Sequence, residues 1–230
     1  MVGFLSEISL FRYGASRALR KLCVAIAASV ALTVPALAEN ITIAALGDSL
    51  TQGYGLPQEE GFVPQLQAWL SAQGAEATLI NAGVSGDTTA GGLSRVAWTL
   101  TDDVDAMIVA LGGNDLLRGI APEVSRANLV GILDAAQQKG VPVMLVGVPA
   151  PNNYGPEYKA AFDAIYPELA TQYEALHFES FLSAITERQD MQGAMRIYMQ
   201  PDGIHPSAKG VALIVEAMGP SVLELISRAR

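Results

Sequence analysis

The sequence predicts an α/β fold, a three-layer α/β/α sandwich built around a parallel sheet of about five strands. The first observation is that short apolar runs alternate along the chain with longer segments of helical periodicity. The second is that such strand–helix–strand connections favour parallel strands with helices on both faces of the sheet. The third is that no repeat, charge block or low-complexity linker divides residues 39–230, which we therefore expect to form one domain.

Five short apolar runs predict the strands. The first begins with Ile41-Thr42-Ile43 and closes at Gly47-Asp48, and the third closes at Gly112-Gly113, which is typical of buried strands followed by turns. The fifth run is weak. The predicted strands cover residues 41–46, 77–80, 106–111, 143–148 and 176–178.

Five segments with apolar residues at helical spacing predict the helices. These segments cover residues 62–73, 89–100, 122–139, 157–174 and 206–228. Glycine or proline inside three of them predicts an interruption at Gly91-Gly92, a kink at Pro167 and a break at Gly219-Pro220. Trp69 and Trp98 lie on helical faces, and we expect both in the core.

The first 38 residues differ from the rest of the chain. Four basic residues precede an apolar run over residues 22–34, and Pro35-Ala36-Leu37-Ala38 follows. This order predicts a secretory signal peptide that is cut after Ala38, and so a periplasmic or secreted protein without stable membrane insertion. The alternative is an N-terminal membrane anchor, although the apolar run is shorter than the roughly 20 residues that span a bilayer.

The composition narrows the classes of function. Half of the 230 residues are hydrophobic and 16% are charged, which excludes disorder. The net charge is −9, and the 192 residues after the leader hold ten basic and 22 acidic residues, a charge of −12. An acidic chain argues against a nucleic-acid partner. The one cysteine, Cys23, lies in the leader, and two histidines far apart make a poor metal site, so we expect no metal.

Glycine-rich and polar segments follow the predicted strands. In parallel sheets, ligands bind outside the carboxyl ends of the strands. Those ends hold Gly47-Asp48-Ser49, Asn81-Ala82-Gly83, Gly112-Gly113-Asn114-Asp115 and residues 149–154. We therefore expect the functional site at this edge of the sheet.

Ser49, Asp202 and His205 are candidates for nucleophilic catalysis. A serine hydroxyl becomes a nucleophile when a base lies within reach. His205 follows Asp202 by three residues, across a glycine that permits a tight turn, so the carboxylate can bind one ring nitrogen and leave the other facing a hydroxyl. The alternatives are Ser49 as a turn or helix N-cap and His205 as a solvated cap of the last helix. His177, inside the weak strand, is expected to be structural.

Acyl transfer also needs hydrogen-bond donors for the developing oxyanion. The Gly83 N–H is unobstructed by a side chain, and Asn114 offers an amide beside two glycines. Each residue also has a structural alternative, which is a turn with positive φ for Gly83 and an Asx turn for Asn114.

Four motifs, in order along the chain, resemble the four blocks of the GDSL (SGNH) hydrolases. They are Gly47-Asp48-Ser49-Leu50, Asn81-Ala82-Gly83, Gly112-Gly113-Asn114-Asp115 and Asp202-Gly203-Ile204-His205. Residues 48–55, 85–89 and 153–155 resemble the periplasmic bacterial thioesterase I / lysophospholipase / arylesterase subgroup. The resemblance implies the SGNH hydrolase fold, with a flavodoxin-like parallel sheet.

The resemblance also implies a function, that of a serine esterase. Such an enzyme hydrolyses carboxylic ester or thioester bonds of small acyl substrates through an acyl-enzyme, without a cofactor. Ser49 would be the nucleophile, His205 the base and Asp202 the residue that orients the base. The Ser49 N–H, the Gly83 N–H and the Asn114 side chain would form the oxyanion hole. Two alternatives remain, a carbohydrate acetylesterase with the same site and a non-catalytic binding module of the same fold.

Other polar residues near these motifs have structural interpretations. Asp48 and Asp115 are expected to accept hydrogen bonds from backbone amides of their own loops. Asp87 is expected to cap the following helix, and Arg118 to be a solvated surface residue.

Overall fold

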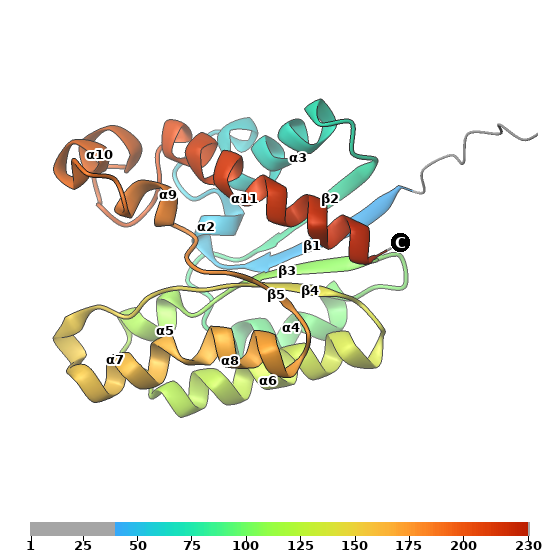
Figure 1. Ribbon diagram of the computed structural model, residues 1–230, viewed down its shortest axis with the longest axis horizontal. Helices are drawn as coiled ribbons and strands as arrows, with labels where there is room; N and C mark the ends of the chain where they lie inside the picture. The colour runs from blue at the N-terminus through green and yellow to red at the C-terminus, as the bar shows by residue number, and fades with distance from the viewer. Residues whose placement is uncertain (1–39, 230) are drawn as a thin grey trace, which may run out of the picture. The chain divides into compact units, whose positions relative to one another are not determined.

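A computed structural model describes residues 40–229, which form a five-stranded parallel sheet between two layers of helices (Figure 1). The strands are Ile41–Gly47 (β1), Ala77–Gly83 (β2), Ala106–Ala110 (β3), Val143–Val146 (β4) and Leu176–Phe178 (β5). Their order, β2-β1-β3-β4-β5, is that of a flavodoxin-like sheet. The predicted fold class is therefore confirmed, while the predicted signal peptide, residues 1–38, lies outside the described residues.

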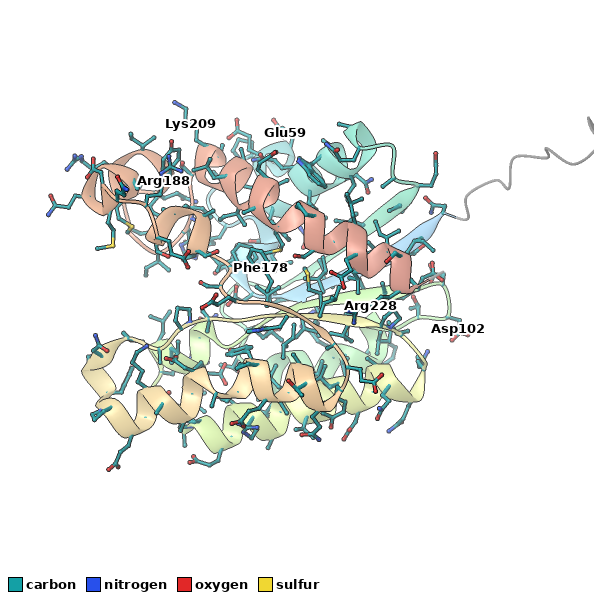
Figure 2. All side chains as sticks on the ribbon, in the orientation of Figure 1. Glu59, Asp102, Phe178, Arg188, Lys209 and Arg228 are labelled. Atoms are coloured by element: carbon teal, nitrogen blue, oxygen red, sulfur yellow. The ribbon has the colours of Figure 1, made fainter. Side chains whose placement is uncertain are left out.

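The two helical layers cover opposite faces of the sheet (Figure 1). The first layer contains Phe62–Ala72 (α3), Ser183–Thr186 (α9), Met191–Tyr198 (α10) and Ala208–Arg228 (α11). The second contains Thr89–Thr99 (α4), Gly113–Leu117 (α5), Pro122–Gln138 (α6), Pro156–Asp163 (α7) and Ile165–Gln172 (α8). Charged side chains such as Glu59 and Lys209 project from the outer side of the first layer (Figure 2).

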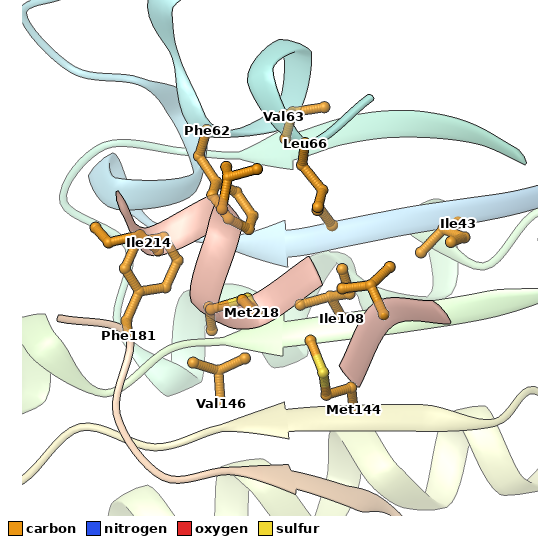
Figure 3. Close-up of a cluster of buried hydrophobic side chains, with 14 of the residues drawn as sticks. Ile43, Phe62, Val63, Leu66, Ile108, Met144, Val146, Phe181, Ile214 and Met218 are labelled. Carbon is orange, nitrogen blue, oxygen red and sulfur yellow. The ribbon is translucent and has the colours of Figure 1, made fainter. Parts of the chain in front are cut away.

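Side-chain alternation along the strands explains why both faces are covered. In β1, Ile43 and Ala45 pack against the first layer, and Ala44 and Leu46 pack against the second. All four are fully buried, as expected for a central parallel strand. Figure 3 shows the core of the first layer, where side chains from the sheet meet those of α3 and α11. The residues labelled there are Ile43, Phe62, Val63, Leu66, Ile108, Met144, Val146, Phe181, Ile214 and Met218.

Helix α11 is continuous through the break predicted at Gly219-Pro220. It begins at Ala208, after Ser207, whose side chain accepts a hydrogen bond from the Gly210 N–H. A Cβ at Gly219 would lie about 2.5 Å from the Trp69 ring, so this glycine serves close packing and not a turn. α11 is long and apolar enough to cross a membrane, but half of its most apolar window is buried in the domain, as in a core helix.

The segment predicted as one kinked helix over residues 157–174 forms two helices, α7 and α8. The division falls at Ala164, three residues before Pro167. A proline ring clashes with the carbonyl four residues earlier and cannot donate to it, so Pro167 is compatible with the first turn of a new helix and not with the middle of a long one.

Helix α4 also differs from its prediction. It runs without interruption through Gly91-Gly92, where the buried Gly92 lies against the side chain of Leu111. Its N-cap is Thr88, whose side chain accepts from the Gly91 N–H, and not Asp87. Trp98 is 85% exposed, so the prediction that it lies in the core is wrong, whereas Trp69 packs against the core.

The strand order creates the crevice where the predicted site residues meet. From β1 the chain passes to β2 on one side and returns to β3 on the other, so the loops that leave β1 and β3 diverge. Ligands bind at such switch points in open α/β sheets. A short helix, Ser49–Gln52 (α2), follows β1 directly at this edge.

Candidate active site

Ser49 is the first residue of α2, immediately after the carboxyl end of β1. Asp48 is the N-cap of α2, and its Oδ1 accepts a hydrogen bond of 3.0 Å from the Leu50 N–H. A Cβ at Gly47 would overlap the Thr51 side chain, so glycine is needed for α2 to fold back against the strand. The local sequence thereby holds the Ser49 hydroxyl at the edge of the sheet.

Asp202 and His205 lie on a tight turn just before α11. The φ of Gly203 is 69°, and Asp202 Oδ1 accepts from the N–H groups of Ile204 (2.9 Å) and His205 (3.1 Å). Asp202 Oδ2 lies 2.7 Å from His205 Nδ1. His205 Nε2 lies 2.8 Å from Ser49 Oγ. The structure therefore brings together the three residues predicted as nucleophile, base and orienting acid.

Asp202 and His205 form an electrostatic pair. The hydrogen bond with His205, supported by those from the Ile204 and His205 N–H groups, lowers the pKa of Asp202 from 3.8 to about 2. An ionised Asp202 accepts a hydrogen bond from the protonated Nδ1. Nε2 is therefore left without a proton and can accept a hydrogen bond from the Ser49 hydroxyl. This tautomer is the one that a general base requires.

Asp48 has the opposite environment. Its side chain is buried, and burial raises its pKa from 3.8 to about 6, although the Leu50 N–H, the nearby His205 and the Asn114 amide oppose that shift. Asn114 Nδ2 donates to Asp48 Oδ2 over 3.3 Å. Asp48 therefore holds its own turn, as predicted, and also orients the Asn114 amide.

Gly83, unlike Ser49, Asn114 and His205, does not line the cavity at this edge of the sheet. Its N–H donates to Asn81 Oδ1 at 3.0 Å, and a Cβ there would overlap the Gln52 backbone, so Gly83 allows α2 to pack on β2. The oxyanion role predicted for Gly83 is not supported by this geometry. Gly86, which the sequence reasoning missed, lines the cavity with a φ of 84°, and its N–H has no partner within residues 40–229.

Ser49 and His205 border a cavity with a volume of about 690 Å³, whereas Asp202 lies behind His205 and is not on its wall. Ser49, Asn114 and His205 are on its wall. Most of the other wall residues are apolar or aromatic, among them Leu50, Tyr54, Leu116, Val148, Leu182 and Ile204. Such a wall suits an apolar group placed next to the nucleophile.

Arg95 of α4 supports the loops around the site. Its Nε pairs with Asp87 Oδ2 at 2.6 Å, and its two terminal nitrogens donate to the carbonyls of Ala82 and Gly47 at 2.6 and 2.9 Å. The guanidinium thus ties the ends of β1 and β2 to the turn that carries Gly86. No motif marked Arg95 in the sequence, because its partners are backbone oxygens of distant residues.

The remaining polar residues have structural roles. Asp115 is fully buried and accepts from the Thr89 N–H and hydroxyl and from the Ser125 hydroxyl, so it joins α4, α5 and α6 and does not hold its own loop. Arg118 is exposed and donates to the Gly86 carbonyl at 2.8 Å. Within residues 40–229, no cluster of three or more His, Cys, Asp or Glu side chains could hold a metal ion.

Comparisons with known proteins identify the family to which the chain belongs. Residues 45–213 match the GDSL-like Lipase/Acylhydrolase family. Esterase TesA of Pseudomonas aeruginosa is 36% identical over 200 residues, which are 86% of this chain and 95% of that protein. Thioesterase 1/protease 1/lysophospholipase L1 of Escherichia coli K12 is 32% identical, over 86% of this chain and 90% of that protein. The solved structure of AlinE4, an SGNH-hydrolase family esterase, is 43% identical with a TM-score of 0.66, over 82% of this chain and 98% of that one.

The family match covers well over half of the chain, and the residues that a non-catalytic relative would have lost are present and hydrogen-bonded to one another. The chain therefore belongs to the GDSL-like lipase/acylhydrolase family and is a serine hydrolase that acts on ester bonds.

Proposed function

We propose that this enzyme hydrolyses carboxylic esters or thioesters with an apolar acyl chain, through an acyl-enzyme on Ser49. The observation that carries the proposal is the chain of hydrogen bonds Asp202–His205–Ser49 opening into a mainly apolar cavity of about 690 Å³. The hydrogen bonds activate the Ser49 hydroxyl as the nucleophile, and the cavity has room for the acyl chain.

The proton of Ser49 Oγ passes to His205 Nε2 as Oγ bonds to the substrate carbonyl carbon. The imidazolium, stabilised by Asp202 on Nδ1, then gives the proton to the leaving alkoxide or thiolate, and the acyl group stays on Ser49. In the second half-reaction, a water molecule gives its proton to Nε2 and attacks the acyl carbon. The bond between the acyl carbon and Ser49 Oγ then breaks, Nε2 returns the proton to Oγ, and the acid product leaves.

We propose three donors for the oxyanion. The Ser49 N–H has no partner within residues 40–229, and neither has the Gly86 N–H. The Asn114 amide gives one hydrogen to Asp48 and keeps the second for the substrate. We assign the oxyanion hole to these groups, with Gly86 in the place predicted for Gly83.

A graded series of substrates tests the acyl preference. Each methylene that enters an apolar cavity contributes about 0.8 kcal/mol, which is up to about fourfold in kcat/KM. We therefore expect kcat/KM for p-nitrophenyl esters to rise from acetate through butyrate to octanoate, with acyl-CoA thioesters following the same order. Ser49→Ala should abolish hydrolysis and leave the circular dichroism spectrum unchanged.

Two variants, one in the cavity and one elsewhere on the surface, test whether the cavity determines the acyl preference. Leu182→Ala should lower kcat/KM for octanoate more than for acetate, because Leu182 lines the cavity. Trp98→Ala, at an exposed aromatic outside the cavity, should leave both values unchanged. If kcat/KM were highest for the acetate ester, and higher still for acetylated sugars than for p-nitrophenyl esters, the result would support the carbohydrate acetylesterase instead.

We also propose that residues 1–38 direct the enzyme to the periplasm or the medium and are removed after Ala38. The support is the order of basic, apolar and small residues in the leader. The mature enzyme would then start at Glu39, one residue before the described domain.

A further inference from the structure

Tyr54 lies against the ring of the predicted catalytic base. The ring centroids of Tyr54 and His205 are 4.6 Å apart, and their planes are inclined by 36°. Tyr54 lines the cavity and is 51% exposed. No hydrogen bond involves its hydroxyl within residues 40–229, and its contact with His205 is made by the ring.

The backbone on both sides of Tyr54 fixes where this ring lies. The N–H groups of Gly53 and Tyr54 both donate to the Ser49 carbonyl, at 3.0 and 3.1 Å. Gly53 and Gly55 have φ values of 90° and 75°, a region that L side chains rarely adopt. The two glycines therefore let the chain turn on both sides of Tyr54, and the Tyr54 ring lies next to His205.

Gln200 links the same segment to the turn that carries His205. Its Nε2 donates to the Tyr54 carbonyl at 2.8 Å and to the Pro206 carbonyl at 3.0 Å, and its backbone N–H donates to the His205 carbonyl at 2.8 Å. Tyr54 is thus attached both to the segment of the nucleophile and to the segment of the base, which are 156 residues apart at Ser49 and His205.

We propose that Tyr54 is a positioning residue, whose ring holds the His205 imidazole against Ser49 and stabilises the imidazolium that forms when Ser49 is deprotonated. The inference rests on the proposed function of Ser49 and His205. Asp202 and Ser49 bind the two ring nitrogens within the plane of the imidazole, but they leave its faces free to tilt. An aromatic ring that lies against the imidazole at 4.6 Å between centroids limits that tilt.

The aromatic face also favours the protonated form of the imidazole. A cation within about 6 Å of an aromatic centroid is attracted by the ring quadrupole. The charged groups that face His205 are Asp202 on its own turn and Asp48 at the start of α2. Tyr54 adds a neutral, polarisable contact to the surroundings of this ring.

Three variants test the proposal by steady-state kinetics. Tyr54→Ala should lower kcat by about 5- to 30-fold, since both the alignment and the imidazolium are affected. Tyr54→Phe keeps the ring and should retain activity within about twofold of wild type. Trp98→Ala removes an exposed aromatic outside the cavity and should change nothing. A change in KM alone for Tyr54→Ala would overturn the proposal, because Tyr54 would then only line the cavity.

A titration by NMR measures the effect on His205 without any substrate. The chain has two histidines, so His177 serves as an internal reference in the same spectra. In Tyr54→Ala the midpoint for His205 should move to lower pH by about 0.4 to 0.7 units, and that for His177 should stay in place. Tyr54→Phe should restore the wild-type midpoint. An unmoved His205 midpoint in a folded Tyr54→Ala variant would overturn the proposal.

The two experiments also separate this inference from the proposed function. If Ser49→Ala kept full activity, the function would be wrong, whereas the NMR titration would still report whether Tyr54 stabilises the imidazolium. If Ser49→Ala were inactive and Tyr54→Ala behaved as wild type in both experiments, only the role of Tyr54 would be wrong.

Discussion

At the scale of single residues, two aspartates in the site have opposite surroundings. Asp202 is partly exposed and its pKa is lowered by its hydrogen bond with His205, so it stays ionised beside the proposed base. Asp48 is buried and its pKa is raised by that burial, so its ionised form is stabilised less. An aspartate side chain therefore binds the proposed base in one place and holds a turn and an amide in the other.

The buried Asp48 predicts a pH dependence of stability. Its pKa is about 6 in the folded protein and 3.8 when unperturbed, so the folded state binds the proton more tightly. The stability it contributes is fully present below pH 3.8 and is lost as the pH rises through 6, by up to about 3 kcal/mol. We expect Asp48→Asn to gain stability relative to wild type between pH 4 and 8, measured by urea unfolding.

A neutral exposed position provides the control for this measurement. Val124→Ala adds and removes no titratable group, so its difference from wild type should be the same at every pH. A difference between Asp48→Asn and wild type that is also constant with pH would contradict the raised pKa of Asp48.

Asn114 carries the second prediction at this scale. Asn114→Ala removes a side-chain donor to the oxyanion and should reduce kcat by about 10²–10³, with little change in KM. Asn128→Ala removes an amide that donates to Thr89 and does not line the cavity, so kcat should stay within a few-fold of wild type. A loss below tenfold for Asn114→Ala would remove Asn114 from the oxyanion hole.

At the scale of elements, helices α3 and α11 contact each other where the Trp69 ring of α3 packs on Gly219 of α11. The Trp69 ring lies over Gly219, and its Nε1 donates to Glu216 at 2.9 Å, one turn earlier in α11. The Gly219-Pro220 pair predicts a break when only local preference is considered. The helix nevertheless continues through this pair, and the missing side chain of Gly219 leaves room for the indole.

This contact predicts a coupling between the two helices. Gly219→Ala should destabilise the protein by about 1–3 kcal/mol, because the added methyl group overlaps the indole. In the Trp69→Leu background the same substitution should cost much less, as a double-mutant cycle by thermal or urea unfolding would show. Equal costs in the two backgrounds would mean that Trp69 and Gly219 do not interact.

At the scale of the whole molecule, the strand order decides which residues meet. Ser49 follows β1, Asn114 follows β3, and His205 lies on the turn before α11. They meet at one cavity because β1 and β3 are neighbours in the sheet. The core on both faces of the sheet, with α11 as its longest helix, holds that edge in place. Described residues 40–229 thus contain every residue assigned to the reaction.

The boundary of the domain gives the prediction at this scale. A variant that begins at Glu39 should fold and hydrolyse esters as the full chain does, by circular dichroism and by kcat/KM. Expressed in a Gram-negative host, the full chain should appear in the periplasm with Glu39 as its N-terminus, and Ala38→Arg should block that cleavage. An uncut N-terminus in the membrane fraction would support the anchor instead.

The sequence by itself determined the alternation of strands and helices and the motifs at the strand ends. Both depend on local chemistry, namely the period of apolar side chains and the need for glycine beside Ser49 and Asp202. Only the tertiary structure decided that Gly86 lines the cavity while Gly83 packs under α2, that Gly219 receives Trp69, and that Tyr54 covers His205. Each of these contacts depends on strand order and close packing between residues far apart in the chain, which no local pattern encodes.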